Sequence, residues 1–324
     1  MANKIKTIGI LTSGGDAPGM NAAVRAIARA SIYKGMRVMG IRRGYNGLIT
    51  GDMYEMHIRS VSEIIHRGGT ILYTARCSEF ATEEGVERAK QVCIENGIDG
   101  IVTIGGDGTF RGARDLCEKG IPCVGLPATI DNDIACSDYA IGFDTAMNTA
   151  MELVDKLRDT TQSHNRCSIV EVMGHNTGYL AINTGVACGA LAIIVPEIEF
   201  DIERDIINRM NQTQRTGKKH FIIVMAEGCG DSVELAHEIE KKTGIDTRST
   251  TLGHVQRGGT PTIRDRVMAS EMGFKAVKLL EQGIGNRIVA YKNGEITDFD
   301  ITEAFTMTKT INRSLLEMSQ MISV

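Results

Sequence analysis

The composition of this chain excludes several classes of protein before any motif is considered. Of its 324 residues, 42% are hydrophobic and 23% are charged, which is typical of a globular chain of about two domains. The net charge of −4 gives no support for a nucleic-acid or anionic-membrane partner, and no apolar run approaches the roughly 18 residues of a membrane span. The eight cysteines lack zinc-binding spacing and no signal peptide precedes the first strand, so we expect reduced thiols in the cytoplasm.

Strand and helix patterns alternate along the sequence. Strands are expected over residues 5–12, 37–42, 100–104, 122–126, 167–172, 191–195, 220–226 and 287–291. Helices are expected over residues 21–33, 145–158, 202–215, 232–243 and 264–282, in two segments that end at Gly97 and Gly120, and from residue 302 onward. This alternation with short connections predicts an α/β fold whose mainly parallel sheets are covered by helices. A weak two-fold repetition of the units predicts two similar lobes that share a cleft.

Polar or glycine-rich segments follow several of the expected strands. They are residues 13–15, 105–109, 127–133 and 173–175, together with Glu227. In open α/β sheets, ligands bind beyond the carboxyl ends of the strands. Packing alone does not explain why polar, acidic or glycine-rich residues follow each of these strands. We therefore expect the functional site at the carboxyl ends of the strands.

Residues 105–109, Gly-Gly-Asp-Gly-Thr, lie between a buried strand and a helix. The free N–H groups and the dipole of a helix N-terminus favour a phosphate, and glycines let the backbone approach it closely. Asp107 would then hold Mg²⁺, which takes carboxylate and phosphate oxygens together. The alternative is an ordinary strand-to-helix turn in which Asp107 caps the helix.

Residues 129–133, Thr-Ile-Asp-Asn-Asp, carry two carboxylates two positions apart. One can act as a general base toward a substrate hydroxyl, while the other faces a metal ion or its waters. The alternative is an Asx turn that caps a helix.

Residues 253–259, Gly-His-Val-Gln-Arg-Gly-Gly, combine an imidazole and a guanidinium with loop glycines. This combination suits a phosphomonoester, because Arg can engage phosphate with two nitrogens. Four arginines at other turns could join this phosphate site: Arg67, Arg76, Arg166 and Arg248. The alternative is that each of them is a solvated surface residue. The sequence has no Walker A pattern and no protein-kinase signature, and its first glycine-rich turn lacks dinucleotide-binding spacing.

Together, these motifs resemble the ATP-dependent 6-phosphofructokinases of the bacterial type. The resemblance rests on the order of residues 11–23, 67–70, 105–109, 129–133, 170–174 and 253–259. Gly-Gly-Asp-Gly alone would also fit NAD kinases or diacylglycerol kinases, whereas the ordered set is specific. The resemblance implies two Rossmann-like lobes. Residues 1–141 with 255–304 would bind ATP and Mg²⁺, and residues 142–254 with 305–324 would bind fructose 6-phosphate.

The resemblance also implies roles for individual residues. Asp131 would take the proton from the sugar 1-hydroxyl, with Thr129, Asp133 and Arg76 as further catalytic residues, and Asp107 would hold Mg²⁺ with help from Asp133. The ATP site would comprise Gly15, Tyr45, Arg76, Cys77, Gly106, Asp107, Gly108 and Thr109. Fructose 6-phosphate would contact Thr129, Ile130, Asp131, Met173, Gly174, His175, Glu227, His254, Val255, Gln256 and Arg257. Arg166 and Arg248 would reach the 6-phosphate from a neighbouring subunit, which implies a homotetramer.

Some positions bear on the choice of substrates. Pyrophosphate-dependent relatives carry Asp and Lys where this chain has Gly108 and Ala128, so the small residues favour ATP. His175 stands where the family carries Arg. A neutral imidazole would neutralise a sugar phosphate less well, and one lost charged contact costs about 2–4 kcal/mol. The acceptor sugar therefore stays open.

An effector site is implied as well. Arg25, Arg29, Glu63, Arg158, Lys218, Lys219 and His220 match the family pattern for binding ADP or phosphoenolpyruvate between subunits. Ile58, Leu191 and Thr216 depart from it, because Arg, an acid that would hold effector Mg²⁺ and Lys are expected there. We hypothesise that activation by ADP is weak or absent.

The sequence therefore predicts a Mg²⁺-dependent kinase that makes fructose 1,6-bisphosphate from ATP and fructose 6-phosphate, the committed step of glycolysis. Two alternatives stay open. One is a kinase of the same fold that uses pyrophosphate or another ketose phosphate. The other is a weakly catalytic regulatory subunit, which Asp107, Asp131 and Asp133 argue against and His175 favours.

Overall fold

The structure is a computed structural model that describes residues 5–323. Its first element is the strand β1 (Thr7–Thr12). All residues of β1 are buried, as expected for a central strand covered on both faces. The helix α1 (Met20–Tyr33) follows, and β2 (Arg37–Ile41) then pairs parallel to β1. Residues 1–4 and 324, which the predicted lobe boundaries include, lie outside the described residues.

A seven-stranded sheet in the order β11-β10-β5-β4-β1-β2-β3 forms the centre of the first unit. Its other strands are β3 (Met53–Glu55), β4 (Gly100–Gly105), β5 (Cys123–Pro127), β10 (Arg287–Lys292) and β11 (Glu295–Asp300). The edge strands β3 and β11 pair antiparallel with their neighbours, and the other pairs are parallel. The sheet is thus mainly parallel, as predicted.

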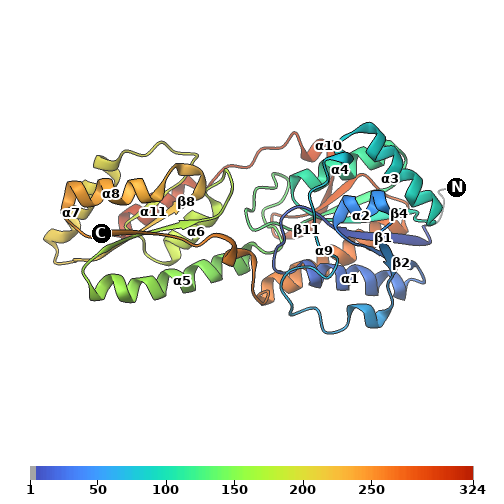
Figure 1. The fold of residues 1–324 in the computed structure, drawn as a ribbon, viewed down its shortest axis with the longest axis horizontal. Helices are drawn as coiled ribbons and strands as arrows, with labels where there is room; N and C mark the ends of the chain where they lie inside the picture. Colours follow the sequence, from blue (N-terminus) through green and yellow to red (C-terminus); the bar gives the residue numbers. More distant parts are fainter. Residues whose placement is uncertain (1–4, 324) are drawn as a thin grey trace. The chain divides into compact units, whose positions relative to one another are not determined.

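Helices cover both faces of this sheet (Figure 1). On one face α1 packs against α9 (Ile263–Glu281). On the other face lie α2 (Gly44–Thr50), α3 (Glu83–Glu95), α4 (Asp107–Glu118) and α10 (Ile301–Ala304). The buried core of this second face joins Leu11 and Ile101 of the sheet to Leu48, Phe110 and Leu116 of the helices.

The second unit is built on a four-stranded sheet in the order β7-β8-β6-β9, and all of its pairs are parallel. The strands are β6 (Cys167–Val172), β7 (Ala192–Ile194), β8 (Phe221–Ala226) and β9 (Thr247–Thr251). A π-helical turn (Glu203–Ile207), α7 (Asn208–Arg215) and α8 (Ser232–Thr243) cover one face. The remaining helices are α5 (Phe143–Ser163), α6 (Tyr179–Ala187) and α11 (Arg313–Ile322), with α6 packed on β8 and α11 on α6.

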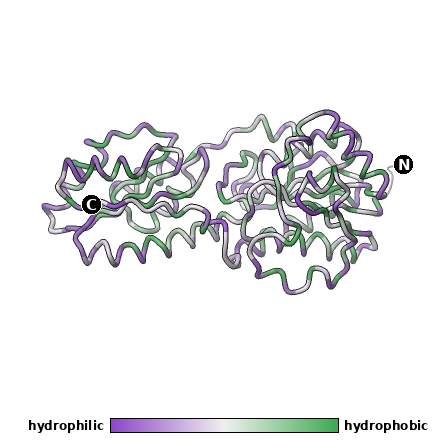
Figure 2. The backbone as a smooth tube through the Cα atoms, in the orientation of Figure 1, coloured by the Kyte–Doolittle hydropathy of each residue, from purple (hydrophilic) through white to green (hydrophobic). Residues whose placement is uncertain are grey.

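In both units most of the longer helices are amphipathic. Figure 2 shows hydrophobic and hydrophilic residues alternating along them, as expected for helices with one buried face. Among the described residues, no helix combines the length and the apolar character that crossing a membrane requires.

The chain passes from one unit to the other several times. The first unit comprises the described residues up to Thr129, then Ile134–Thr145 and Arg257–Lys309. The second comprises Ile130–Asp133, Ala146–Gln256 and the described residues from Thr310 onward. Residues 129–133 therefore begin in one unit and end in the other. The ligands assigned to the two lobes stay a prediction.

Some regular elements were not predicted, among them α2, β3, β9 and β11. β9 reads Thr-Arg-Ser-Thr-Thr, which lacks apolar alternation but contains the β-branched threonine that strands favour. Asn293 and Gly294 join β10 to β11 with φ values of 52° and 88°. This Asn-Gly turn is a strong hairpin signal, so β11 could have been predicted from it.

The prediction of one continuous helix from residue 302 onward is wrong. α10 ends at Ala304 and α11 begins only at Arg313. The segment between them contains several threonines, whose β-branched side chains lower helix propensity. Asn312 then caps α11, because its side chain accepts a hydrogen bond from the Leu315 N–H at 3.1 Å.

Candidate active site

The turn between β4 and α4 is fastened to the glycine-rich turn that follows β1. The Thr109 hydroxyl donates to the Ser13 carbonyl at 3.1 Å, and the Ser13 N–H donates to the Ile104 carbonyl at 3.0 Å. A Cβ on Gly105 would lie 2.3 Å from the Ser13 carbonyl oxygen and 2.4 Å from the Thr109 hydroxyl. Only glycine therefore permits the two turns to approach this closely.

Gly106 and Gly108 face more open surroundings. A Cβ on Gly106 would meet only the Thr129 Cβ, at 4.0 Å, and a Cβ on Gly108 would meet nothing within 4 Å. Gly106 is the N-cap residue of α4, and no side chain caps this helix. The N-terminus of α4 is thus a place where backbone N–H groups and the helix dipole favour an anion.

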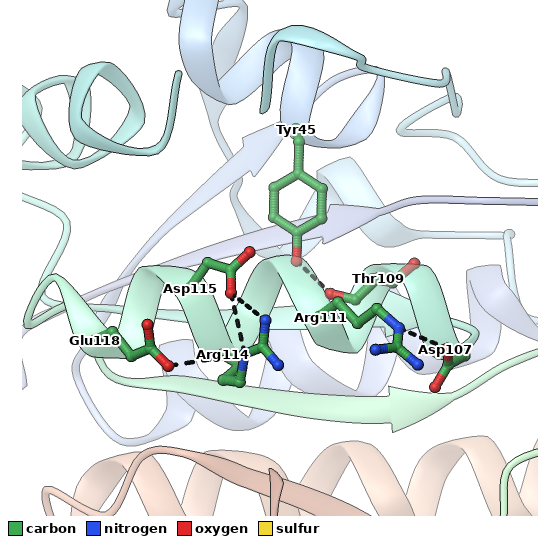
Figure 3. A network of polar contacts seen from close by, with 7 residues as sticks. All are labelled: Tyr45, Asp107, Thr109, Arg111, Arg114, Asp115 and Glu118. Atoms are coloured by element: carbon green, nitrogen blue, oxygen red, sulfur yellow. Dashed lines mark hydrogen bonds and ion pairs between the residues drawn. The ribbon is translucent and has the colours of Figure 1, made fainter. Parts of the chain in front are cut away.

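Asp107 is the first residue of α4, and its side chain is 49% exposed. Its carboxylate forms an ion pair with the Arg111 Nε at 2.9 Å, one helical turn further on (Figure 3). Because Gly106 occupies the N-cap position, the alternative in which Asp107 caps the helix is wrong. Arg111 also lies over the Phe305 ring, 4.8 Å from its centroid, so the carboxylate has an ordered partner but stays accessible.

Tyr45 supports this turn from inside the protein. Its side chain is only 5% exposed and stacks on Phe80, with 4.0 Å between the ring centroids. Its hydroxyl donates to the Thr109 carbonyl at 2.5 Å (Figure 3). Burial is the main reason that the pKa of Tyr45 is raised well above its ordinary value. Tyr45 therefore acts on the predicted ATP site by holding Thr109.

Arg257 lies against the glycine-rich turn after β1. Its Nη1 donates to the Asp16 carbonyl at 3.3 Å, and a Cβ on Gly15 would lie 2.3 Å from the same nitrogen. The structure thus brings together Gly15, which was predicted for ATP, and Arg257, which was predicted for the sugar. Arg76 is exposed and Cys77 is half-buried, and no described hydrogen bond joins either side chain to this turn.

Residues 129–133 start beside the same turn. The Ala128 N–H donates to the Gly105 carbonyl at 2.9 Å, and the Thr129 side chain is buried. Asn132 has a φ of 52°, a left-handed conformation that Asn tolerates better than most residues. No helix begins between here and α5 at Phe143, so the alternative of an Asx turn that caps a helix is wrong.

The remaining residues of this segment belong to the second unit. Ile130 is fully buried, whereas Asp131 and Asp133 are half-buried. The Thr177 hydroxyl donates to the Asp131 carbonyl at 3.3 Å, which fixes the backbone that carries the predicted base. A second bond of this hydroxyl, to the Gly174 carbonyl at 2.9 Å, links Asp131 to the loop after β6.

Loops after β6, β8 and β9 meet in the second unit. The His175 N–H donates to the Glu227 Oε1 at 2.7 Å, and the Met173 N–H donates to the Gln256 Oε1 at 3.4 Å. Gln256 is fully buried and therefore organises the loops from within. Gly174 has a φ of 143° and precedes His175, whose φ is 54°. His254 and Val255 are exposed on the neighbouring loop.

Two predicted sugar-phosphate residues lie near the β6–β9 pair: Arg166 directly precedes β6, and Arg248 lies in β9. Both form ion pairs with Asp246, a residue that sequence reasoning missed. No motif marks Asp246 in the sequence. Only the parallel pairing of β6 with β9 brings it between the arginines.

The predicted effector residues are divided between the units. Arg25 and Arg29 are half-buried on α1 in the first unit. In the second unit, the Arg158 Nη2 donates to the Cys188 carbonyl, while Lys219 is exposed. Burial and then the charge of Arg158 lower the pKa of Lys218, and burial, Lys218 and Arg158 lower the pKa of His220. Arg158, Lys218 and His220 thus lie near one another, and Arg158 and Lys218 carry the positive charge of this cluster.

Known proteins are similar to this chain in both sequence and fold. The sequence pattern of the family described as Phosphofructokinase matches residues 7–280. A Clostridium botulinum protein named ATP-dependent 6-phosphofructokinase is 54% identical over 98% of this chain and 100% of its own length.

Solved structures give the same result. The T-state phosphofructokinase of Pichia pastoris is 35% identical, with a TM-score of 0.89 over 98% of this chain and 37% of its own. A pyrophosphate-dependent phosphofructokinase from Marinobacter aquaeolei is 20% identical, covers 97% of this chain and 91% of its own with a TM-score of 0.85, and shares the fold. The chain belongs to the phosphofructokinase family.

Proposed function

We propose that this chain transfers the γ-phosphoryl group of MgATP to the 1-hydroxyl of fructose 6-phosphate, giving fructose 1,6-bisphosphate and ADP. The observation that carries the proposal is the junction at Gly105, which lies close to the hydrogen-bonded Thr109 and Ser13 and whose carbonyl accepts a hydrogen bond from the Ala128 N–H. A phosphate-binding helix N-terminus thereby adjoins the segment that leads to Asp131. The 54% identity to a relative named ATP-dependent 6-phosphofructokinase supports this reaction, the committed step of glycolysis.

The nature of two small residues supports ATP as the donor. Gly108 faces open space, and Ala128 is buried. The Asp and Lys of the pyrophosphate-dependent pattern would place charged side chains where the nucleotide phosphates are expected. We therefore favour ATP over pyrophosphate.

The residues at the N-terminus of α4 fit Mg²⁺. Asp107 offers one accessible carboxylate there, and the described residues contain no cluster of three or more side chains that would form a complete metal cage. Mg²⁺ commonly binds through one or two carboxylates, substrate phosphates and waters, which this donor set can supply. When bound, Mg²⁺ would neutralise negative charge on the phosphates. Asp107, helped by Asp133, would hold it.

In the proposed reaction, Asp131 takes the proton of the sugar 1-hydroxyl as this oxygen attacks phosphorus. Thr129 orients the phosphates and Arg76 neutralises the charge on the group being transferred, while Arg257 contacts fructose 6-phosphate. The fixed position of Arg257 against the Asp16 carbonyl supports this role. Phosphoryl transfer depends mainly on positioning and charge neutralisation, and the chain supplies both.

Fructose 6-phosphate is proposed to bind the loops that Glu227 and Gln256 hold together, with Met173, Gly174, His175, His254 and Val255. The backbone hydrogen bonds to both organising side chains support a preformed site. Arg166 and Arg248 would reach the 6-phosphate of a neighbouring subunit in a homotetramer. All eight cysteines are free thiols, which suits a cytoplasmic enzyme.

A regulatory anion site between subunits, which the family resemblance implies, is proposed to include Arg158, Lys218, Lys219 and His220, with Arg25 and Arg29 as further residues. Burial and, after it, neighbouring positive charge lower the pKa of Lys218 and of His220, and a group of positive charges attracts anions. Ile58 is 51% exposed and Leu191 is 1% exposed, and neither can hold a phosphate or a metal ion. ADP should therefore lower the half-saturating fructose 6-phosphate concentration only weakly or not at all, and a clear drop would contradict this proposal.

One coupled assay tests the main proposal. The purified chain alone is supplied with fructose 6-phosphate and either ATP or pyrophosphate, with and without Mg²⁺. We expect turnover with ATP and Mg²⁺ only. Turnover with pyrophosphate, or a preference for another ketose phosphate, would show that the chain uses a different phosphoryl donor or acceptor sugar. No turnover with any donor would favour a regulatory subunit.

A further inference from the structure

One carboxylate joins the two arginines that flank the start of the β6–β9 pair. The Asp246 Oδ2 lies 2.5 Å from the Arg166 Nε, and its Oδ1 lies 2.9 Å from the Arg248 Nε. Each oxygen thus serves one guanidinium group. The three side chains form a single cluster with Asp246 at its centre.

The backbone of this cluster is fixed by the sheet. The Cys167 N–H donates to the Asp246 carbonyl at 3.0 Å, and Ser168 stands opposite Arg248 in the parallel register. The Arg166 N–H donates to the Thr161 carbonyl at 3.0 Å. Because the main chain is held in this way, the remaining conformational freedom is that of the side-chain rotamers. The carboxylate is the group that restricts it.

The terminal nitrogens of both guanidinium groups stay available. Each ion pair uses Nε, and within residues 5–323 no hydrogen bond involves the Nη atoms of Arg166 or Arg248. The side chains are 34% and 64% exposed. Phosphate oxygens are recognised by paired guanidinium nitrogens. Both guanidinium groups can therefore offer their Nη atoms to a phosphate, while the ion pairs of their Nε atoms with Asp246 orient them.

We propose that Asp246 is a positioning residue for phosphate recognition, which holds Arg166 and Arg248 ready for the 6-phosphate. This inference rests on the proposed function, in which both arginines bind the sugar phosphate. Without the carboxylate, the two like charges repel and both long side chains sample many rotamers. A phosphate must then order them on binding, which weakens its affinity.

A competing effect has the opposite sign. Removal of Asp246 raises the local positive charge, which attracts a phosphate more strongly. Asp246 and both arginines are partly exposed, however, and charge interactions between partly exposed groups contribute only about 0–1 kcal/mol. We therefore expect the loss of ordering to outweigh the gain of charge.

The test is steady-state kinetics of Asp246→Asn, which keeps the size of the side chain and removes its charge. We expect the KM for fructose 6-phosphate to rise about tenfold, the effect of disordering two long side chains. The kcat and the KM for ATP should stay within about twofold of wild type, the range expected for a site without contact to the nucleotide. Asp246→Glu should recover most of the affinity.

The matched control is Asp205→Asn, which removes the acid of another ion pair in the same unit, with Arg204 at 2.7 Å. It should leave both KM values unchanged. A second check places Asp246→Asn in the Arg166→Ala/Arg248→Ala background. There it should have almost no effect on the KM for fructose 6-phosphate, because Asp246 acts through the arginines.

Several results would overturn the inference. They are an unchanged or lower KM for fructose 6-phosphate in Asp246→Asn, an equal effect in Asp205→Asn, or a full effect in the arginine-free background. Failure of the proposed function is distinguishable, because wild type would then show no turnover with ATP and fructose 6-phosphate. A thermal unfolding midpoint equal to that of wild type confirms that each variant is folded.

Discussion

The hydroxyl of Tyr45 donates a hydrogen bond to the Thr109 carbonyl at 2.5 Å, from a side chain that is only 5% exposed. The turn at the N-terminus of α4 thus depends on a residue more than sixty positions earlier in the chain. Because burial raises the pKa of Tyr45, the hydroxyl stays protonated at neutral pH. It therefore remains a donor under all physiological conditions.

Tyr45→Phe should weaken both the fold and the nucleotide site. The ring and its stacking on Phe80 remain, but the buried Thr109 carbonyl loses its donor. We expect the free energy of unfolding to fall by about 1–3 kcal/mol and the KM for ATP to rise, with the KM for fructose 6-phosphate unchanged. Denaturant titration and steady-state kinetics measure these effects. Tyr54→Phe, at a half-buried ring, is the control, and an equal effect there would show that Tyr45 has no special role.

Gly108→Asp should lower the turnover with ATP without lowering the stability of the fold. No atom lies within 4 Å of the position that its Cβ would take, and an acid in the first turn of a helix is favourable by about 0.3–1 kcal/mol. The thermal midpoint should therefore not fall. ATP turnover should drop by about 100-fold or more, because a negative charge now faces the phosphates. Gly108→Ala, without the charge, should retain most activity; if both variants lose activity equally, bulk rather than charge decides.

The sequence allowed the fold class and most elements to be predicted, because apolar strands and glycine helix ends are local signals. β6 and α8 appear with the predicted bounds. What failed depends on longer-range effects or on weak patterns. β9 is polar and acquires its strand conformation by pairing with β6. The helix expected from residue 302 is divided by threonines, whose low propensity the pattern of apolar residues did not reveal.

The candidate site was predicted residue by residue through family resemblance, but its supporting contacts were not. Nothing in the sequence relates Asp246 to Arg166, eighty positions earlier. The contact of Arg257 with the Asp16 carbonyl is likewise a product of the fold. Such partners lie in sequence segments without a motif of their own. Only the sheet register and the packing of loops bring them together.

His175→Arg should improve the use of fructose 6-phosphate. The family carries Arg at this position, and a charged contact to phosphate contributes about 2–4 kcal/mol. His175 has a φ of 54°, a left-handed conformation that His tolerates better than most residues, so Arg adds a backbone penalty that the charged contact should outweigh. We expect kcat/KM for fructose 6-phosphate to rise about tenfold or more, with the KM for ATP unchanged.

The control for this variant is His237→Arg, which makes the same change at an exposed position of α8. It should leave kcat/KM unchanged. If His175→Arg has no effect or lowers kcat/KM, then the imidazole serves the natural substrate better than a guanidinium. Assays with other ketose phosphates would then identify the sugar that the histidine suits.

Asp131→Asn should abolish most of the catalysis without loss of binding. The amide keeps the shape of the side chain but cannot accept the proton of the sugar hydroxyl. We expect kcat to fall by roughly 10²–10⁴, the usual contribution of a positioned general base, while both KM values stay close to wild type. Asp159→Asn, at an exposed position of α5, should have no effect. If kcat changes less than about threefold in folded Asp131→Asn, another group takes the proton, because loss of a general base costs far more than this.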